Sequence, residues 1–313
     1  MKKKILMFGS FVVDLTGRGP HLPVPGETVK SGYFKMGPGG KGYNQGIAAF
    51  QSGGEVTIVT KLGNDLFANI ALDFMKNLGM DTSRILRTDE YSTGTALIEV
   101  DEKTGQNAIM VIPSACDHIT DDEVDSLKDL ISSSDIVLTQ LETNYSALSR
   151  LIDLAYSAGK QIVLNTAPVQ PISDKLLAKC SIVTPNAVEA AALSGIPVTD
   201  EKSASAAAGY FLKKGVKAVI ITMGEKGAFV TDGKTEKMIP AYPVQALDTT
   251  GAGDAYNGGL VTALSEGKDI FEAARFASAV GALAVQKIGT APAMPRRDEI
   301  DAFIASRGKE NEE

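Results

Sequence analysis

Short apolar segments alternate with helical patterns along the second half of the chain. Each apolar segment has the length of a strand, and the apolar residues between segments recur with a helical period. We expect strands at 135–141, 161–164, 181–184 and 218–222, and helices at 145–158, 187–193, 203–214, 253–265, 270–285 and 297–306. Glycines at 159, 195 and 215 follow the first three helices, which is a typical C-terminal signal. The alternation predicts a sheet of parallel strands with crossover helices on both faces.

The first third of the chain has a different pattern. Polar and apolar residues alternate at 28–35 and 93–100, and a short strand pattern follows at 108–112. No helical pattern separates these segments, so we interpret them as a small, half-exposed sheet added to the main domain in two pieces. Before them, the apolar run 5–13 follows three lysines, as in a signal peptide. Gly9 and Ser10 interrupt this run and no small-residue cleavage site follows, so we expect a first buried strand in a cytoplasmic protein.

Charge and residue usage exclude several classes of function. The 313 residues include 38 acidic and 31 basic side chains, for a net charge of −7, which argues against nucleic acid or an anionic membrane as partner. No apolar stretch is long enough to span a bilayer. Cys116, Cys180, His21 and His118 have no metal-ligand or redox spacing, so neither a zinc site nor a disulfide framework is expected. Both cysteines are interpreted as small core residues.

The segment 248–254, DTTGAGD, stands at the start of a helical pattern. Gly251, Ala252 and Gly253 have little or no side chain, so the free N–H groups of the first helical turn can approach an anion closely. Asp254 in that turn could accept a proton from an attacking hydroxyl. The alternative interpretation is an N-cap on a tightly packed helix.

The segment 37–45, GPGGKGYNQ, is a second glycine-rich start to a helical pattern, which we expect from about residue 43 to 51. Lys41 and Asn44 lie where the backbone is open, and they could form hydrogen bonds with several hydroxyls of a polyol. The alternative here is a glycine loop with a solvated lysine.

Together these segments resemble the GGKGxNQ and DTxGAGD signatures of the ribokinase (PfkB) family of sugar kinases. Three intermediate segments are also similar to family motifs, namely QLE at 140–142, TPNAVE at 184–189 and ITMGEKG at 221–227. The resemblance extends from Phe8 to about Phe303. It implies one kinase domain over residues 1–313, with a Rossmann-type three-layer α/β/α core. It also implies a small β-sheet lid over the sugar, from strands at about 13–36 and 92–112.

The resemblance assigns roles to matching positions. Asp254 resembles the catalytic base, and Gly251, Ala252 and Gly253 resemble the anion hole. The positions that resemble sugar contacts are Asp14, Gly40, Lys41, Asn44, Glu142 and Asp254. Those that resemble ATP contacts are Asn186, Thr222, Gly224, Gly227, Gly253 and Ser278. Asn186 and Glu189 also fit a helix N-cap with its capping-box acid.

The resemblance also implies two metal ions. Glu189 resembles the residue that orders water around Mg²⁺. A potassium site is implied at Asp248, Thr250, Ala284, Lys287 and Gly289, whereas Ala293 replaces the serine that ribokinases often have there. The family often dimerises through its lid strands, which implies a homodimer.

The first strand departs from the ribokinase pattern G-S-x-N-x-D. Val12 occupies the position of the ribose-binding Asn, and an apolar side chain leaves a buried hydroxyl unpaired at a cost of about 1–3 kcal/mol. Tyr43, where Ala is common, is expected to narrow or restack the pocket. We expect phosphorylation of the 5-hydroxyl of ribose or of 2-deoxyribose by ATP. A nucleoside or hexose kinase of the same fold, or a non-catalytic sugar or nucleotide sensor, are the alternatives.

Overall fold

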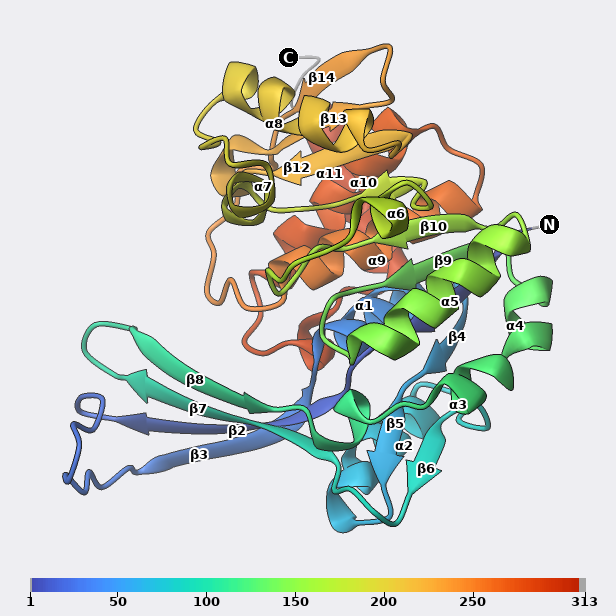
Figure 1. Ribbon diagram of the computed structural model, residues 1–313. Helices are drawn as coiled ribbons and strands as arrows, with labels where there is room; N and C mark the ends of the chain where they lie inside the picture. Colours follow the sequence, from blue (N-terminus) through green and yellow to red (C-terminus); the bar gives the residue numbers. More distant parts are fainter. Residues whose placement is uncertain (1, 310–313) are drawn as a thin grey trace.

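The computed structural model describes residues 2–309, and its core is an eight-stranded sheet (Figure 1). The strand order is β14-β13-β12-β11-β10-β9-β1-β4. The parallel strands are β1 (Lys4–Phe8), β4 (Glu55–Val59), β9 (Ile136–Thr139), β10 (Gln161–Leu164), β11 (Ile182–Val183) and β12 (Ala218–Thr222). The antiparallel hairpin β13 (Ala228–Thr231) and β14 (Glu236–Ile239) completes the sheet at one edge, where the sequence pattern indicated no strand.

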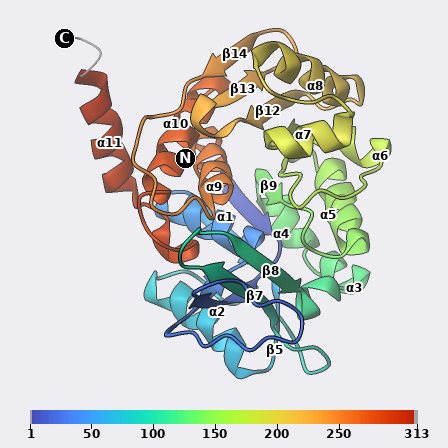
Figure 2. The same ribbon diagram turned by 90° about the vertical axis from the view of Figure 1, so that its left-hand side faces the viewer.

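Helices cover both faces of this sheet, so the predicted α/β/α architecture is confirmed (Figures 1 and 2). Alternate residues of β1 enter different cores, because successive side chains of a strand point to opposite faces. Ile5 and Met7 pack with one set of helices, and Leu6 and Phe8 pack with the other. The first set is α1 (Lys41–Gln51), α2 (Leu66–Asn77), α9 (Ala252–Ser265), α10 (Ile270–Ala284) and α11 (Arg297–Lys309). The second is α3 (Asp121–Asp125), α4 (Lys128–Ser133), α5 (Tyr145–Ser157), α6 (Asp174–Leu177), α7 (Ala187–Ser194) and α8 (Glu201–Lys213).

A separate four-stranded sheet projects from one side of this domain (Figure 1). Its order is β3 (Tyr33–Gly39), β2 (Val12–Gly19), β7 (Gly94–Asp101) and β8 (Asn107–Ile112). We call these four strands the lid sheet. They come from two separate stretches of the chain, one before α1 and one after α2.

Two expectations for this region were wrong. The apolar run 5–13 is not one strand but is divided between two sheets. Strand β1 of the main sheet ends at Phe8, and strand β2 of the lid sheet begins at Val12. The strand expected at 28–35 lies instead at Tyr33–Gly39. The β2–β3 ladder ends at Tyr33, and the hydroxyl of Ser31 lies 2.7 Å from the Tyr33 carbonyl oxygen and 2.5 Å from that of Arg18. Side-chain bonds of this kind compete with the ladder for backbone groups.

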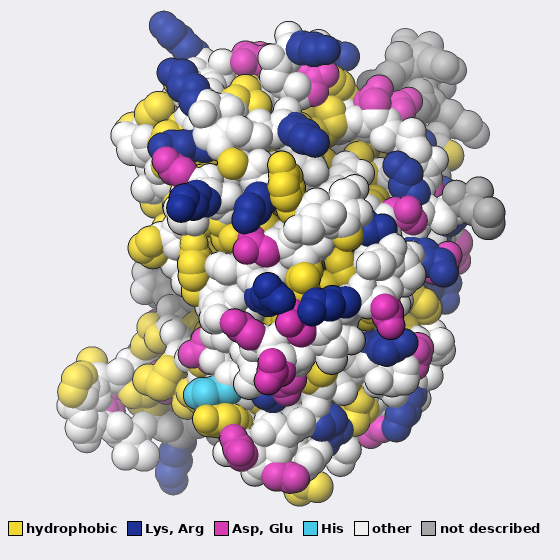
Figure 3. All heavy atoms as spheres, turned by 45° about the vertical axis from the view of Figure 1, so that its right-hand side comes forward, with side chains coloured by type: hydrophobic (Ala, Val, Ile, Leu, Met, Phe, Trp, Pro, Cys, Tyr) yellow, Lys and Arg dark blue, Asp and Glu magenta, His cyan; other side chains and the backbone are white. Residues whose placement is uncertain are grey.

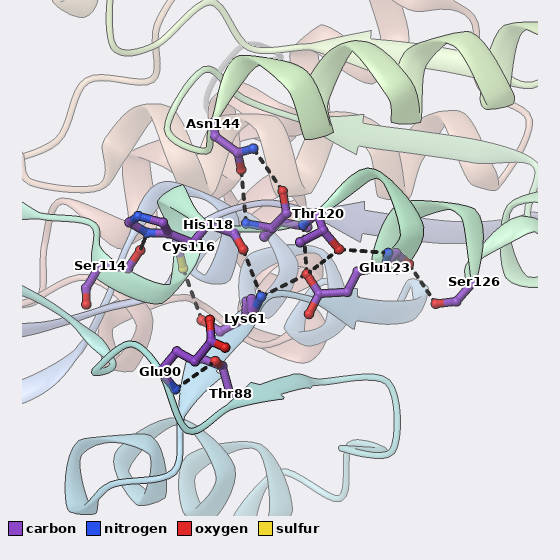
Figure 4. Close-up of polar contacts among 11 residues, drawn as sticks. Lys61, Thr88, Glu90, Ser114, Cys116, His118, Thr120, Glu123, Ser126 and Asn144 are labelled. Carbon is purple, nitrogen blue, oxygen red and sulfur yellow. Dashed lines mark hydrogen bonds and ion pairs between the residues drawn. The ribbon is translucent and has the colours of Figure 1, made fainter.

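Lys61 anchors the segment that follows the lid sheet to the main domain (Figure 4). It begins β5 (Lys61–Gly63), which pairs with β6 (Leu86–Thr88). The buried ammonium group donates to the His118 carbonyl oxygen and to Glu123 Oε2, both at 2.8 Å. The Cys116 thiol, also buried, lies 3.3 Å from the Lys61 carbonyl oxygen. These contacts fix the chain directly after β8, and Cys116 packs as the core residue that was expected.

Acidic and basic side chains are interspersed over the face shown in Figure 3. Such a mixture gives no field of one sign that would favour a polyanion. Among residues 2–309, no helix is long and apolar enough to cross a bilayer.

Candidate active site

Close backbone packing places the start of α1 against the end of β1. Gly40 precedes α1 with φ = 90°, a conformation that favours glycine. A Cβ atom on Gly42 would lie 2.6 Å from Cα of Gly9, so the two backbones touch without side chains between them. The glycines of the 37–45 segment therefore allow Lys41 and Asn44 to lie beside the carboxyl ends of the parallel strands. Ligands commonly bind at this edge in open α/β sheets.

A second glycine-rich start belongs to α9. Gly251, in the left-handed conformation at φ = 79°, is its N-cap, and Asp254 lies in the first turn. Gly258 of α9 packs directly on the backbone of α1, where a Cβ atom would lie 2.6 Å from the Ala49 nitrogen. Because the two helices pack so closely, their N-terminal turns lie side by side. The free N–H groups of α9 and the positive end of its dipole therefore face the same space as α1.

Asp254 is the central carboxylate of this space. Its Oδ2 accepts a hydrogen bond from Asn44 Nδ2 at 3.1 Å, and its Oδ1 accepts one from Gln45 Nε2 at 2.9 Å. Burial raises the pKa of Asp254 to about 6, although Lys41 and the two amides favour the charged form. The pKa of Lys41 lies above its ordinary value, because nearby carboxylates outweigh the opposing effect of burial. An ammonium group thus accompanies a carboxylate that can take up a proton near neutral pH.

Two further carboxylates, Asp14 and Glu142, complete the side nearest the lid sheet. The Asp14 carboxylate packs directly on Gly39, where a Cβ atom would lie only 2.4 Å from it. Burial is the main cause that raises the pKa of Asp14 to about 6. Glu142 Oε2 accepts the backbone N–H of Lys41 at 2.8 Å and the hydroxyl of Ser10. The predicted sugar-binding side chains are therefore brought together around the start of α1.

A small cavity of about 170 Å³ lies between these residues and α7. Lys41, Asp254 and Glu189 line it. Asn186 is the N-cap of α7, and both Glu189 carboxylate oxygens already accept N–H groups from Asn186, at 2.7 and 2.9 Å. Oxygen ligands suit Mg²⁺, which usually keeps several waters and binds one or two carboxylates together with phosphates. The chemistry of the cavity fits that ion, which Glu189 would hold through water rather than directly.

A larger cavity of about 590 Å³ adjoins the small one, because Thr222, Thr249, Ala252 and Gly253 line both. Its walls come from the end of β12, the N-terminus of α9 and one side of α10. All the predicted ATP contacts except Asn186 line it, namely Thr222, Gly224, Gly227, Gly253 and Ser278. Asn186 lines the small cavity and forms an isolated bridge with Thr222. The volume is of the order that a nucleotide-sized ligand requires.

The loop before α9 and the loop after α10 are joined by Asp248. Its carboxylate accepts the N–H of Thr250 at 2.9 Å and that of Gly289 at 3.0 Å. These bonds lower the pKa of Asp248, although partial burial opposes them. The ammonium group of Lys287 is directed to Glu299, at 2.8 Å. Asp248 is thus an ionised carboxylate at the junction of these two loops, and the nearby lysine charge is paired with Glu299. A carboxylate oxygen is a ligand type that fits a hard monovalent cation.

Several polar residues at this edge of the sheet were not assigned from the sequence. Gln45 and Gln140 lie behind Asp254 and are almost fully buried. Thr290 donates to the Pro38 carbonyl oxygen at 3.0 Å and lies 3.3 Å from Asp14. Gln45 falls within the GGKGxNQ pattern and Gln140 within QLE, so the motif letters were the available signal. Thr290 follows the predicted cation loop directly but belongs to no motif.

The expectation for Tyr43 was wrong. Its ring is fully buried between Phe11 and Phe74, with centroid distances of 4.9 and 6.4 Å. The hydroxyl donates to the Ala71 carbonyl oxygen at 2.8 Å. The side chain points from α1 toward α2 and forms part of the hydrophobic core, because that side of α1 faces away from the cavities.

Two adjoining cavities meet at the N-terminus of α9, which carries the buried carboxylate of Asp254, and Lys41 at the start of α1 lines the smaller cavity. This arrangement defines a phosphotransferase, because phosphoryl transfer depends on positioning and on stabilising negative charge. A profile described as "pfkB family carbohydrate kinase" matches residues 2–297. The chain therefore belongs to the pfkB family of carbohydrate kinases, and it is an enzyme that phosphorylates an alcohol group of a sugar.

Individual relatives and solved structures agree with this assignment. The chain is 38% identical over 304 residues to a ribokinase of Haemophilus influenzae, covering 97% of this chain and 99% of the relative. It superposes on the crystal structure of a Thermotoga maritima ribokinase with a TM-score of 0.88, at 34% identity and with 97% and 100% of the two chains covered. An Arabidopsis thaliana ribokinase complexed with ribose and ATP gives a TM-score of 0.89, at 27% identity and with 97% and 99% covered.

One relative has a different named substrate. The chain is 30% identical over 302 residues to a deoxyribokinase of Salmonella typhi, covering 96% of this chain and 98% of the relative. The identity of the sugar therefore has to be argued from the residues of this chain.

Proposed function

We propose that this kinase transfers the γ-phosphoryl group of ATP to the 5-hydroxyl of a ribose-type pentose. The observation that carries the proposal is the position of Asp254, which two amides hold and which lines the small cavity next to Gly253, a residue of both cavities. The Arabidopsis relative was solved with ribose and ATP, and it superposes over 97% of this chain.

In this proposal, each side chain of the site has a defined task. Asp254 accepts the proton as the sugar O–H bond breaks, while the sugar oxygen bonds to the γ-phosphorus and ADP leaves with the electrons of the broken P–O bond. The backbone N–H groups of Gly251, Ala252 and Gly253 stabilise the negative charge that develops on the phosphoryl oxygens. Lys41, which also lines the small cavity, adds a positive charge.

The sugar contacts follow from unused hydrogen-bonding capacity. Among the described residues, the buried Asn44 Oδ1 has no hydrogen-bond partner, so it can accept from a sugar hydroxyl. The Asp14 and Glu142 carboxylates can accept from other hydroxyls. Closure of the lid sheet over the sugar would exclude water, which otherwise competes as acceptor.

Two metal ions belong to the proposal. Mg²⁺ would neutralise charge on the ATP phosphates, and Glu189 would orient its water ligands. K⁺ would bind beside the anion hole, with the Asp248 carboxylate and the backbone carbonyl oxygens of Thr250, Ala284, Lys287 and Gly289 as its ligands. The site then combines one carboxylate that accepts a proton with others that hold cations.

The test is a panel of ribose, 2-deoxyribose, hexoses and nucleosides, scored by kcat/KM with ATP. We expect a pentose to be the best substrate. Asp254→Asn should lower kcat by at least about a thousandfold and leave ATP binding within about twofold. A hexose or nucleoside as the best substrate, or full activity of Asp254→Asn, would contradict the proposal. Sugar-dependent ADP release excludes a non-catalytic sensor.

A second candidate substrate, 2-deoxyribose, is favoured by Val12. This residue is buried with 4% exposure and lies on the same face of β2 as Asp14, two positions away. An apolar side chain at that place suits a sugar that lacks one hydroxyl.

We also propose that the protein acts in the cytoplasm, where ATP is available, as a homodimer formed through the lid sheets. The register aligns Met36, Leu15, Leu97 and Met110 in one row across all four lid strands. Met36, Leu97 and Met110 are 48%, 44% and 63% exposed. A second copy of the lid sheet would cover this row and the exposed strand edges.

A further inference from the structure

A buried chain of amide groups lies behind the Asp254 carboxylate. Gln140 Nε2 donates to Gln45 Oε1 at 2.7 Å, and Gln45 Nε2 donates to Asp254 Oδ1 at 2.9 Å. Gln45 Nε2 also donates to Asn165 Oδ1 at 3.0 Å, and Asn165 Nδ2 donates to the Thr184 carbonyl oxygen at 2.8 Å. The exposed fractions of Gln45 and Gln140 are 0% and 1%. These amides join α1 to the ends of β9, β10 and β11.

The charge of Asp254 determines the orientation of every amide in this chain. An ionised carboxylate can only accept hydrogen bonds, so the Gln45 NH₂ group must face it. Both hydrogens of that group are then used, one by Asp254 and one by Asn165, which leaves Gln45 Oε1 as an acceptor for Gln140. No member of the chain can rotate without breaking a hydrogen bond in a site that excludes water.

The backbone leaves room for this arrangement only at a glycine. A Cβ atom on Gly9 would lie 2.0 Å from Gln140 Oε1. The side chain of Gln140 therefore fills the space that a larger residue at position 9 would occupy. The first glycine after β1 contributes to the active site by seating Gln140, in addition to its contact with Gly42.

We propose that Gln45 and Gln140 are positioning residues, which hold the Asp254 carboxylate ionised and oriented toward the acceptor hydroxyl. Asp254 meets an N–H donor at each oxygen, since Asn44 donates to Oδ2 and Gln45 to Oδ1. A proton on Asp254 would weaken both hydrogen bonds, because N–H groups bind an ionised carboxylate more strongly than a neutral carboxyl group, so the amides favour the charged form. With Oδ1 fixed by Gln45 and one lone pair of Oδ2 used by Asn44, the other lone pair of Oδ2 remains to accept the proton of the substrate hydroxyl. This inference rests on the proposed role of Asp254 as the base.

Other charged groups also face Asp254, and they influence its pKa independently of the amide chain. Lys41 of α1 favours the ionised carboxylate, whereas Glu142 after β9 and Asp14 of β2 oppose it. None of these groups is altered when Gln45 or Gln140 is replaced. A change in the pH dependence of such variants therefore reports the amide chain itself.

The experiment compares Gln45→Leu, Gln140→Leu and the wild type by the pH dependence of kcat, with whichever sugar the wild type uses best. We expect Gln45→Leu to lower kcat by about 10–100-fold, because small misplacement of a base is costly. The acid limb of its profile should move up by about one pH unit. Gln140→Leu, which touches Asp254 only through Gln45, should give a shift of the same sign and a loss of about 3–10-fold. KM for ATP should stay within about twofold in both.

Two controls separate positioning from a general loss of structure. Gln51→Leu removes the same side chain from the far end of the same helix and should leave the profile unchanged. In an Asp254→Asn background, Gln45→Leu should cost no more than about twofold, because no carboxylate remains to be positioned. A full additional loss there would indicate a structural role and overturn the proposal.

The outcomes remain distinct from those that test the proposed function. A wild type that prefers a hexose would contradict the pentose substrate and leave the amide chain testable with that hexose. Thermal melting shows whether each variant is folded, and if Gln45→Leu does not fold, the pH profile of Gln140→Leu decides alone. An acid limb unmoved from that of the wild type in the folded variants would overturn the proposal.

Discussion

The Thr290 hydroxyl lies 3.3 Å from Oδ2 of Asp14, although 276 positions separate the two residues. Thr290 directly follows Gly289, whose N–H group is bound by Asp248. It also donates to the Pro38 carbonyl oxygen of β3. One side chain thus connects the loop of the proposed cation site with two strands of the lid sheet and with a carboxylate proposed to bind the sugar.

This contact predicts a selective effect of Thr290→Val on the sugar. The substitution keeps the shape of the side chain and removes the hydroxyl, which costs about 1–2 kcal/mol when a buried partner is left unpaired. We expect KM for the sugar to rise by about 5–30-fold, with KM for ATP unchanged. Steady-state kinetics with each substrate varied in turn measures this. Thr290→Ser should retain most of the wild-type value, and an equal loss in both variants would contradict the role of the hydroxyl.

The raised pKa of Asp254 predicts the pH dependence of turnover. The base must be ionised to accept a proton, and burial raises its pKa to about 6. We therefore expect kcat to be constant above about pH 7 and to fall about tenfold per pH unit well below 6. Burial also raises the pKa of Asp14 to about 6. Protonation of Asp14 in the same pH range should therefore lower kcat/KM for the sugar. Because the two carboxylates interact, the apparent pKa values of these pH profiles belong to the pair and not to either residue alone.

The residual activity of Asp254→Asn provides the control for this profile. It should show no acid limb in kcat, because the titrating base is gone. An acid limb near pH 4 in the wild type would mean that Asp254 has an ordinary pKa in the working enzyme.

The parts of the site that could be predicted are those encoded in short stretches. Glycines at 40, 42, 251 and 253 show where a helix begins with an open backbone, and the functional side chains follow within a few residues. The structure indeed brings Lys41, Asn44 and Asp254 together. Parallel strands and crossover helices were predictable for the same reason, since each is visible within a window of about a dozen residues.

The remaining contacts depend on partners that are distant in the chain. Gln45 bonds to Asn165 and Asp254 across 120 and 209 positions, and a glutamine has no local pattern that marks it as a buried relay. The β13–β14 hairpin was missed because neither of its strands stands out in the sequence, since AFVT directly continues the glycine-containing segment 221–227 and EKMI begins with two charged residues. The N-terminal run was read as one strand because its apolar residues continue across the junction between two sheets.

Asp248 predicts a response to monovalent cations. Activity should increase several-fold when K⁺ replaces a bulky organic cation at constant ionic strength. Asp248→Asn removes the charge and can accept with only one oxygen, so the K⁺ concentration for half-activation should rise by at least about tenfold. Asp232→Asn is a matched control, because Asp232 also accepts two backbone N–H groups in a surface turn. Equal activity of the wild type in both cations would contradict a cation site.

The exposed row on the lid sheet predicts the effect of one charge on assembly. Met110 lies on the edge strand β8 with 63% of its surface exposed. Met110→Lys would bury an ammonium group against the second lid sheet, which is costly without a partner. Sedimentation velocity should show a dimer for the wild type and a monomer for this variant. Tyr156→Lys, an equivalent change of an exposed residue on α5, should remain dimeric. A monomeric wild type would refute the proposed assembly.

Val12 predicts which pentose is preferred, and how that preference can be changed. The residue is opposite Gly39 and Gly94 in the neighbouring strands, so no other side chain at these positions separates it from the space around Asp14. Wild-type enzyme should therefore favour 2-deoxyribose over ribose in kcat/KM.

Val12→Asn supplies an amide that can pair with the additional hydroxyl of ribose, and a buried hydrogen bond of this kind changes discrimination by about 1–3 kcal/mol. We expect the ribose-to-deoxyribose ratio of kcat/KM to rise by about 5–150-fold. Val12→Thr, which keeps the volume and adds a hydroxyl, should raise the ratio by a smaller factor. If both variants kept the wild-type ratio, Val12 would not contact the sugar, and the preference would have to come from another residue on the lid.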